Sequence, residues 1–404
     1  MDLSETAGSA PLCCAVRRGS EVLGYVAIDS TIGGRSCGGL RMLPDVDEAE
    51  MAGLARAMTL KYGFLGLPQG GAKAGVRGDP EAAPEIRRQR LRDFGEAISP
   101  LLRSRRYTPH PDMGTDNGDI VHMLEAAGVR VKRRELRCTD SAYYTAVTVW
   151  AAARQTARWC GMDLSACRIA IGGYGKVGRA LAGLFASAGV RVVAVSTSRG
   201  AIYAPQGLDV ARLEQLAAAT GSEVVNACAD GEQMRRETLW ELPVDILCPC
   251  ARHDSIHAGN ARAVAARIIC AGANNPVTPE ARRCLSERGV VCVPDFVSNC
   301  GGVLGGTMEF AAVRRERIAR FLDQQIGMRV EWLLAEAARR RLLPHDLAVE
   351  EAMRRFDRVR QRAERPRLRG RLFEAGLEAH RRGWLPRGLV GSLAMPYFER
   401  VLAS

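Results

Sequence analysis

Apolar residues recur at helical spacing in two stretches of the first 140 residues. The stretch 45–66 (DVDEAEMAGLARAMTLKYGFLG) predicts a helix that begins at an aspartate N-cap and stops at Gly66. The stretch 80–103 predicts a second helix, and 21–29 (EVLGYVAID) predicts a strand. The polar segment 106–120 (RYTPHPDMGTDNGDI) indicates a loop. This part of the chain is therefore predicted to mix helices and strands.

From residue 141 onward the pattern alternates strands with helices. A long helix is predicted over 141–161, and 167–196 has the pattern of a strand, a glycine turn, a helix and a second strand. Strands that alternate with helices indicate a parallel doubly wound sheet. From Gly305 onward the pattern is helical. Further apolar strands are predicted at 244–250, 267–274 and 290–296.

These patterns predict an α/β protein in three segments. We expect an N-terminal α/β domain at 1–140, a Rossmann-type doubly wound parallel-sheet domain at 141–330, and C-terminal helices at 331–404 that pack back on the first domain. A length of 404 residues suits two hydrophobic cores. An apolar fraction of 47% and a charged fraction of 25% are ordinary for a globular protein. No run approaches the roughly 20 apolar residues of a membrane span.

Cysteine usage and charge exclude several classes of function. Most of the 13 cysteines lie inside apolar runs, which indicates buried free thiols and, with no export signal at the N-terminus, a cytoplasmic location. Cys248 and Cys250 have no second pair at zinc spacing, so no metal site is predicted. The net charge of +12 arises mainly in residues 311–404, which hold 21 arginines and 12 acidic residues. Their helical spacing is typical of a solvated helix face, and nucleic-acid binding would need a denser patch with aromatic residues.

A glycine-rich turn lies between the first predicted strand and helix of the second domain. Gly173, Gly175 and Gly178 form a G-x-G-x-x-G pattern that also contains Lys176 and Val177. In this context the pattern predicts dinucleotide binding, because the glycines permit a tight turn and close approach of a pyrophosphate to the helix N-terminus. The alternative is a glycine turn required only for packing.

The end of the next strand bears on the choice between NAD and NADP. An acidic residue there would bind the ribose 2′-hydroxyl of NAD. This strand ends instead in Thr197, Ser198 and Arg199, which suit a 2′-phosphate and favour NADP. Arg199 as a solvent-facing turn residue is the alternative, so both cofactors stay open.

Lys73 lies in an unusually small and apolar segment, GLPQGGAKAGV (66–76). We interpret this segment as a glycine–alanine loop in which desolvation lowers the pKa of the lysine and bare backbone approaches a small substrate. An incidental lysine in a tight loop is the alternative. A phosphate-binding P-loop is excluded, because Ala72 and Ala74 flank the lysine and the GK[ST] pattern is missing. Lys61 lies about one turn before Gly66.

Six motifs occur in order along the chain. They are GGLRMLPD (38–45), MTLKYGFLGLPQGGAKAGV (58–76), PDMGTD (111–116), IGGYGKVG (171–178), AGANNPVTPEA (271–281) and VPDFVSNCGGV (293–303). With these motifs the chain resembles the glutamate/leucine/phenylalanine/valine dehydrogenase family over roughly residues 20–360. The resemblance implies reversible oxidative deamination of an L-amino acid to a 2-oxo acid and ammonia, with NAD or NADP, by an oligomer.

The resemblance also implies roles for individual residues. Lys61 would bind the substrate α-carboxylate, Lys73 would polarise the carbonyl and activate water, and Asp112 would carry protons to and from the nitrogen. Asn299 falls where the family contacts substrate or nicotinamide. Further positions assigned in this way are Gly70, Gly71 and Val303 to the substrate, and Thr145, Ala251 and Asn274 to the cofactor.

Two positions depart from the glutamate-specific pattern. Cys37 stands where those members have a lysine that binds the side-chain carboxylate, and Gly306 stands where they have a serine. Because an unpaired carboxylate in an apolar pocket is costly, we predict a non-acidic substrate, aliphatic or aromatic. Arg35, two residues before Cys37, keeps glutamate open as an alternative.

Two further hypotheses remain. One is a biosynthetic relative that acts on an unusual 2-oxo acid, and the other is a catalytically silent relative that binds a nucleotide and contacts a partner through its arginine-rich tail. Retention of Lys61, Lys73 and Asp112 together argues against a silent protein.

Overall fold

The computed structural model describes residues 11–131, 140–364, 376, 379–380 and 382–403. The chain divides into two compact units, each of which is described by itself. Unit 1 comprises Met1–Cys138, Glu351–Leu393 and Glu399–Ser404, and unit 2 comprises Thr139–Glu350 and Ala394–Phe398. The C-terminal part of the chain thus returns to unit 1.

Unit 1 is built on a five-stranded mixed sheet with the order β1-β2-β4-β3-β5. The strands β1 and β2 are antiparallel, β2 and β4 are antiparallel, and β3 runs parallel to both β4 and β5. The strands are β1 (Leu12–Arg18), β2 (Glu21–Ile28), β3 (Ser36–Leu43), β4 (Gly70–Arg77) and β5 (Thr108–Pro111). Alternate apolar residues such as Leu40, Met42, Ala74 and Val76 bury one sheet face against α2 (Pro84–Ala97), α3 (Ser99–Arg103) and α4 (Asn117–Ala126).

Helix α1 (Glu48–Leu65) is buried along most of its length. It begins at Asp47, whose side chain accepts a hydrogen bond from the Glu50 amide, and it ends at Gly66 with φ 68°, the left-handed cap that glycine adopts without strain. The Cβ of an alanine at Gly63 would lie 2.2 Å from the carbonyl oxygen of Ala352 in α13 (Pro344–Glu364). Helix α1 therefore packs closely against the returning chain.

Two local predictions for unit 1 are wrong. Lys73 lies in the middle of strand β4, and 106–120 contains β5 and the start of α4. The small residues around Lys73 had suggested a loop, but they serve strand packing. A Cβ at Gly71 would lie 2.2 Å from the Thr59 nitrogen of α1. A third prediction, one helix over 80–103, is also corrected. The segment forms two helices, α2 and α3, which are separated at Ile98.

Unit 2 contains a seven-stranded sheet with the order β12-β11-β10-β6-β7-β8-β9. The first five are parallel, and β8 and β9 add antiparallel edges. The chain reverses its direction of winding between β6 and β10, which places a crevice at the carboxyl ends of these strands. The strands are β6 (Arg168–Gly172), β7 (Arg191–Thr197), β8 (Gly200–Tyr203), β9 (Glu232–Met234), β10 (Ile246–Pro249), β11 (Ile268–Cys270) and β12 (Val291–Val293).

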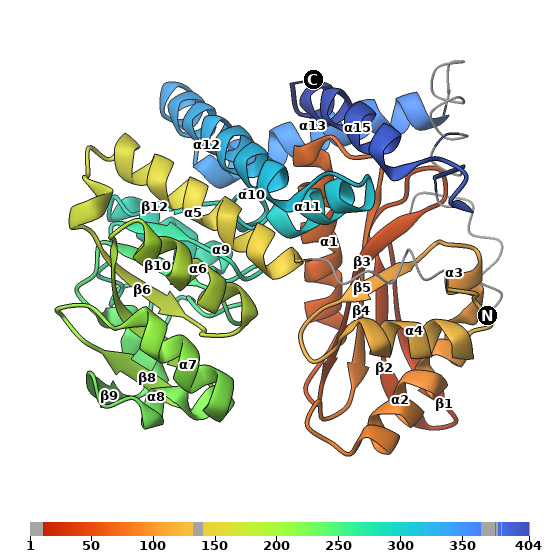
Figure 1. Ribbon diagram of the computed structural model, residues 1–404, viewed down its shortest axis with the longest axis horizontal. Coiled ribbons are helices and arrows are strands. Elements are labelled where there is room, and N and C mark those ends of the chain that lie inside the picture. Colours follow the sequence, from red (N-terminus) through yellow and green to blue (C-terminus); the bar gives the residue numbers. More distant parts are fainter. Residues whose placement is uncertain (1–10, 132–139, 365–375, 377–378, 381, 404) are drawn as a thin grey trace. The chain divides into compact units, whose positions relative to one another are not determined.

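Helices complete unit 2, and the predicted α/β fold is confirmed. In Figure 1 the long helices α5 (Ser141–Trp159) and α12 (Arg315–Arg340) lie side by side. The division predicted at residue 330 cuts through α12, which belongs wholly to unit 2. The other helices of four or more residues are α6 (Lys176–Ser187), α7 (Val210–Thr220), α8 (Val224–Ala227), α9 (Pro279–Glu287), α10 (Asp295–Ser298), α11 (Gly301–Phe310) and, near the C-terminus, α15 (Arg387–Ala403). Among the described residues, no helix combines the length and the apolar character that crossing a bilayer requires.

Candidate active site

One face of the unit 1 sheet, called the site face below, packs partly on α1 through an apolar cluster that includes Ala27, Met51 and Leu54, and it also carries charged side chains. Side chains alternate along β3, so Cys37, Gly39 and Arg41 share this face. Gly39 leaves room for the charged groups, because a Cβ there would lie 2.8 Å from Asp112 Cβ and 2.9 Å from Lys73 Nζ. Gly38 points to the opposite side, where a Cβ would lie 1.6 Å from the Ala72 carbonyl oxygen.

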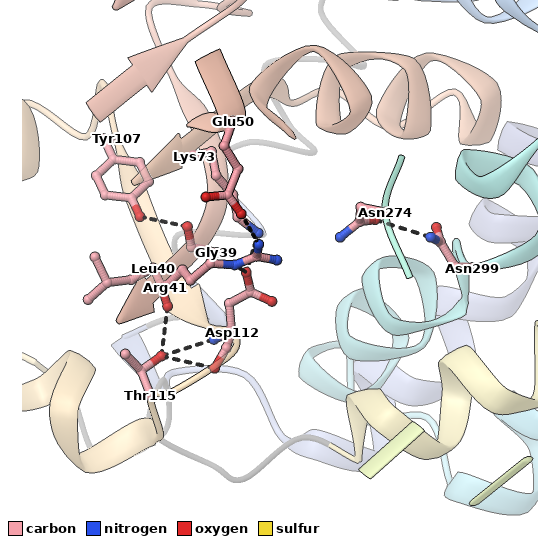
Figure 2. A network of polar contacts seen from close by, with 10 residues as sticks. All are labelled: Gly39, Leu40, Arg41, Glu50, Lys73, Tyr107, Asp112, Thr115, Asn274 and Asn299. Atoms are coloured by element: carbon pink, nitrogen blue, oxygen red, sulfur yellow. Dashed lines mark hydrogen bonds and ion pairs between the residues drawn. The ribbon is translucent and has the colours of Figure 1, made fainter. Parts of the chain in front are cut away.

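A network of four charged residues lies on the site face (Figure 2). The Lys73 ammonium pairs with Asp112 Oδ2, and Arg41 Nε lies 3.2 Å from the same oxygen. Arg41 also donates through Nη1 to Glu50 Oε1 of α1. Lys73, Arg41 and Glu50 are buried, whereas the Asp112 side chain is 23% exposed. The network is therefore open to a ligand at Asp112.

Burial and neighbouring charges shift the proton affinities of the central pair. Burial lowers the pKa of Lys73, and the Arg41 charge adds to this, while Asp112 raises it; the net direction is downward. Burial raises the pKa of Asp112, but Lys73 and Arg41 more than offset it and hold the carboxyl well below its usual range. Asp112 is thus a carboxylate, and Lys73 gives up its proton more readily than an ordinary lysine.

Hydrogen bonds to the sheet hold Asp112 in place. The Thr115 hydroxyl donates to the Leu40 carbonyl at 2.7 Å and accepts from the Asp112 amide at 3.0 Å. The Tyr107 hydroxyl donates to the Gly39 carbonyl at 3.2 Å. These contacts, drawn in Figure 2, join β3 to the residues on both sides of β5. The carboxylate is therefore positioned before a substrate arrives.

The other substrate-binding candidates of unit 1 lie on α1 and β4. Lys61 is only 5% exposed and lies in α1, two residues after Thr59, which packs on Gly71. Gly70 packs as closely on Ser30, because a Cβ at Gly70 would be 2.1 Å from the Ser30 carbonyl oxygen. Neither glycine position therefore has room for a side chain. Arg35, which precedes β3, is exposed.

The sequence analysis missed several groups on the site face. Arg41 and Glu50 complete the charged network, and Arg41 is the arginine of the GGLR motif that was quoted only for resemblance. Tyr62 and His110 both hydrogen-bond the Cys37 thiol. The alternation of side chains along β3 indicates that Arg41 shares a face with Cys37 and Gly39. The partners of Arg41 on other elements could not be identified without the register of the sheet.

The glycine turn of unit 2 has the geometry that a dinucleotide requires. Gly173 has φ 121°, and a Cβ there would lie 2.8 Å from the Ala251 side chain that follows β10. A Cβ at Gly178 would lie 1.9 Å from the Gly173 carbonyl oxygen. Gly175 and Lys176 are exposed at the start of α6, and a Cβ at Gly175 would meet no atom within 4 Å. Since no side chain caps this helix, its first amides can receive a pyrophosphate.

The end of β7 holds Arg199 by two contacts. Its amide donates to the Thr197 hydroxyl at 3.1 Å, and its guanidinium lies 3.0 Å from Glu223 in an exposed ion pair. Ser198 is exposed beside it. An arginine and two hydroxyls are therefore present, but a carboxylate is already bound to the arginine.

The remaining candidates of unit 2 lie on α5, on α11, at the C-cap of α10 and in the segment after β11. The Asn299 side chain donates to the Ala273 carbonyl at 2.8 Å and to Asn274 Oδ1 at 3.1 Å (Figure 2). The Thr145 hydroxyl donates to the Ser141 carbonyl. Val303 and Gly306 lie on α11, and a Cβ at Gly306 would meet no atom within 4 Å. The described residues hold no group of three or more His, Cys, Asp or Glu side chains arranged to ligate a metal.

A dinucleotide turn in one unit and a buried lysine–carboxylate pair in the other define the class of nicotinamide-dependent dehydrogenases. The chain belongs to the glutamate/leucine/phenylalanine/valine dehydrogenase family. The main family model matches residues 139–361, and a second, described as the dimerisation domain of these enzymes, matches residues 14–128. The predicted family and enzyme class, an oxidoreductase that acts on the CH–NH2 group of amino acids, are confirmed.

Named relatives support this assignment. A glutamate dehydrogenase of Thermotoga maritima is 36% identical over 295 residues, which cover 69% of this chain and 70% of the relative. An NAD-specific glutamate dehydrogenase of Staphylococcus aureus is 33% identical over 294 residues, with the same coverage. A solved hetero-hexameric glutamate dehydrogenase of Thermus thermophilus, in a leucine-bound form, has a TM-score of 0.74 and 27% identity, and the match covers 86% of this chain and 88% of that one. An L-tryptophan dehydrogenase of Nostoc punctiforme, 22% identical with a TM-score of 0.59 over 86% of this chain and 96% of that one, shares the fold.

Proposed function

We propose that this protein catalyses the reversible oxidative deamination of an L-amino acid to a 2-oxo acid and ammonia. The observation that carries the proposal is the pair of buried Lys73 and half-buried Asp112 on a sheet face cleared by Gly39. A lysine with a lowered pKa releases and takes back its proton more readily than an ordinary lysine, and its ammonium form stabilises negative charge on oxygen.

Three residues of unit 1 share the work in this proposal. Lys61 binds the substrate α-carboxylate, for which its cationic side chain is suited. Lys73 polarises the carbonyl group and removes a proton from the attacking water. Asp112, ionised and partly exposed, carries protons to and from the nitrogen. Burial of Lys73 strengthens each of these interactions, because water screens them less.

A nicotinamide dinucleotide supplies the hydride acceptor of this reaction when it is bound. The fit is supported by the turn at Gly173, Gly175 and Gly178, with its uncapped helix N-terminus. In the proposal, Lys176, Val177 and Ala251 lie along the dinucleotide, and Thr145 and Asn274 hold its nicotinamide end. Asn299 orients Asn274 through its hydrogen bond and contacts substrate or nicotinamide.

The terminal residues of β7 support NADP over NAD. Thr197, Ser198 and Arg199 offer hydroxyls and a cation for a 2′-phosphate. Glu223 competes for Arg199 and weakens the preference, and a relative with 33% identity is named NAD-specific. We therefore propose that the protein uses NADP and retains a lower activity with NAD.

A non-acidic substrate remains the leading proposal for specificity. Cys37 replaces a lysine at the substrate side chain, and Gly306 leaves open space on α11 beside Val303. Glutamate is the second candidate, and it is favoured by the named glutamate dehydrogenases among the relatives. Gly70 and Gly71 bring bare backbone to the substrate.

We also propose that the protein is a homo-oligomer in the cytoplasm. Residues 14–128 match a domain described as a dimerisation domain, and the Thermus relative is hetero-hexameric. The distribution of cysteines in apolar runs supports a reducing compartment.

The test is reductive amination by the purified protein. Loss of NADH or NADPH absorbance is followed with ammonia and branched-chain, aromatic or five-carbon dicarboxylic 2-oxo acids. Lys73→Ala should lower kcat by at least about 100-fold, while cofactor binding measured by fluorescence is retained. Lys73→Arg is the matched variant. It keeps the charge but cannot release the proton, so it should be equally inactive. Full activity in either variant would refute the role of Lys73.

A further inference from the structure

A thiol, a phenol and an imidazole meet at the site face, and none of them has a part in the proposed proton transfers. Cys37 of β3 is hydrogen-bonded by Tyr62 of α1 and by His110 of β5. Cys37 and Tyr62 are 6% and 4% exposed, whereas His110 is exposed. We call Cys37, Tyr62 and His110 the thiol cluster.

The register of the sheet places the thiol cluster beside the catalytic pair. Gly39 is opposite His110 in the parallel pairing of β3 with β5. The Lys73 amine lies over Gly39, because a Cβ there would be 2.9 Å from Nζ. A substrate whose reacting carbon is at Lys73 therefore has the thiol cluster next to it on the same sheet face.

The thiol cluster holds a charge-compensated pair. Burial raises the pKa of Cys37, but the charge and hydrogen bond of His110 and the hydrogen bond of Tyr62 lower it by more. The Cys37 charge raises the pKa of His110 more than burial lowers it. The two shifts bring the proton affinities of Cys37 and His110 closer together, and the pair has a net charge of zero whichever of the two groups holds the proton.

This arrangement discriminates between three kinds of substrate side chain. The His110 ring has two nitrogens; one is used by Cys37, and the other belongs to an exposed ring and is able to donate a hydrogen bond to a ligand. An apolar side chain would cover this donor without offering an acceptor. A carboxylate would lose its hydration beside a pair that has no net positive charge to compensate for the loss. An uncharged oxygen accepts the hydrogen bond at neither cost.

We propose that His110, held in place by Cys37 and Tyr62, is a specificity-determining residue that favours substrates whose side chain ends in an uncharged oxygen acceptor, a carboxamide or a hydroxyl. This inference rests on the proposed amino-acid dehydrogenase function and narrows its non-acidic substrate class. Cys37 then acts as the residue that positions His110 through their hydrogen bond, and not as an apolar replacement for a lysine.

The experiment compares three amino acids of similar size in the oxidative direction. L-glutamine, L-glutamate and L-leucine end in a carboxamide, a carboxylate and methyl groups. The full-length protein should have its highest kcat/KM with L-glutamine. His110→Ala should lower that value by about tenfold or more, mainly through KM, and change the value for L-leucine by less than about threefold.

Matched variants separate recognition from folding. His110→Gln retains a neutral side-chain donor and should recover part of the L-glutamine activity. His122→Ala removes a histidine of the same unit that hydrogen-bonds the Arg88 carbonyl, and it should change no substrate ratio. An equal loss for all three substrates in His110→Ala, or a wild-type preference for L-leucine or L-glutamate, overturns the inference.

Failure of the proposed function is distinguishable from failure of the inference. If neither cofactor supports turnover of L-leucine, L-glutamine or L-glutamate, the dehydrogenase proposal is refuted. The imidazole resonances of His110, assigned through His110→Gln, are then followed by NMR as each amino acid is added. A shift with L-glutamine that exceeds those with the other two supports recognition by His110, and equal or absent shifts overturn it.

Discussion

The neighbouring glycines Gly38 and Gly39 provide a direct test of how the site is built, because the same substitution at each should fail for a different reason. In Gly39→Ala the new methyl group would lie 2.8 Å from Asp112 Cβ and 2.9 Å from Lys73 Nζ. Restoring ordinary contact requires a displacement of about 0.6 Å at Asp112 Cβ. Lysine ends move easily, whereas Asp112 is tied to Thr115 and the sheet.

We therefore expect Gly39→Ala to fold and to lose activity. Displacements of this size at reacting groups cost about 10- to 100-fold in rate, so kcat should fall by that factor. In Gly38→Ala the methyl group would lie 1.6 Å from the Ala72 carbonyl oxygen of β4. Neither strand can move far enough to remove this overlap without breaking the pairing of β3 with β4. This variant should therefore accumulate as unfolded or insoluble protein.

The assays are steady-state kcat together with thermal unfolding followed by circular dichroism. Gly78→Ala is the control, since a Cβ there meets its nearest atom at 3.5 Å, an ordinary contact. It should retain both activity and melting temperature. A Gly39→Ala enzyme with kcat within about twofold of wild type would refute the view that this glycine clears space for the pair.

Two further predictions concern protonation and cofactor choice. Asp112 raises the pKa of Lys73, so Asp112→Asn should lower that pKa further. Because oxidative deamination needs neutral Lys73, the rise of kcat/KM with pH should then occur at lower pH. The maximum of kcat/KM should also fall by about 100-fold, since the proton carrier is lost. A pH profile of the residual activity checks the direction, and a shift to higher pH would contradict it. Glu223→Gln should release Arg199 and improve the kcat/KM ratio of NADPH to NADH by several-fold, and an unchanged ratio would remove Arg199 from cofactor recognition.

The predictions that succeeded from the sequence were those that depend on neighbours along the chain. The glycine turn between β6 and α6, the helix that stops at Gly66, and the alternation of strands and helices after residue 141 are local patterns. Lys73 was recognised as a buried lysine because its neighbours are too small to solvate it. The same small residues led to the wrong secondary structure for Lys73. A glycine–alanine strand that packs closely under a helix has the same composition as a glycine-rich loop.

What required the tertiary structure was every contact between distant segments. Arg41 reaches Asp112 across 71 positions, and the pairing of β3 with β4 and β5 decides which residues share its face. The thiol cluster joins three elements, so the role of Cys37 could not be judged from its own neighbours.

The sequence by itself determined the family and the enzyme class, because six motifs of that family stand in order along the chain. The tertiary structure decided that Lys73 is a strand residue, that Arg41 and Glu50 complete its network, and that Cys37 is paired with His110. The physical reason is that burial and charge depend on what other segments bring within a few ångströms, and sheet register fixes that arrangement.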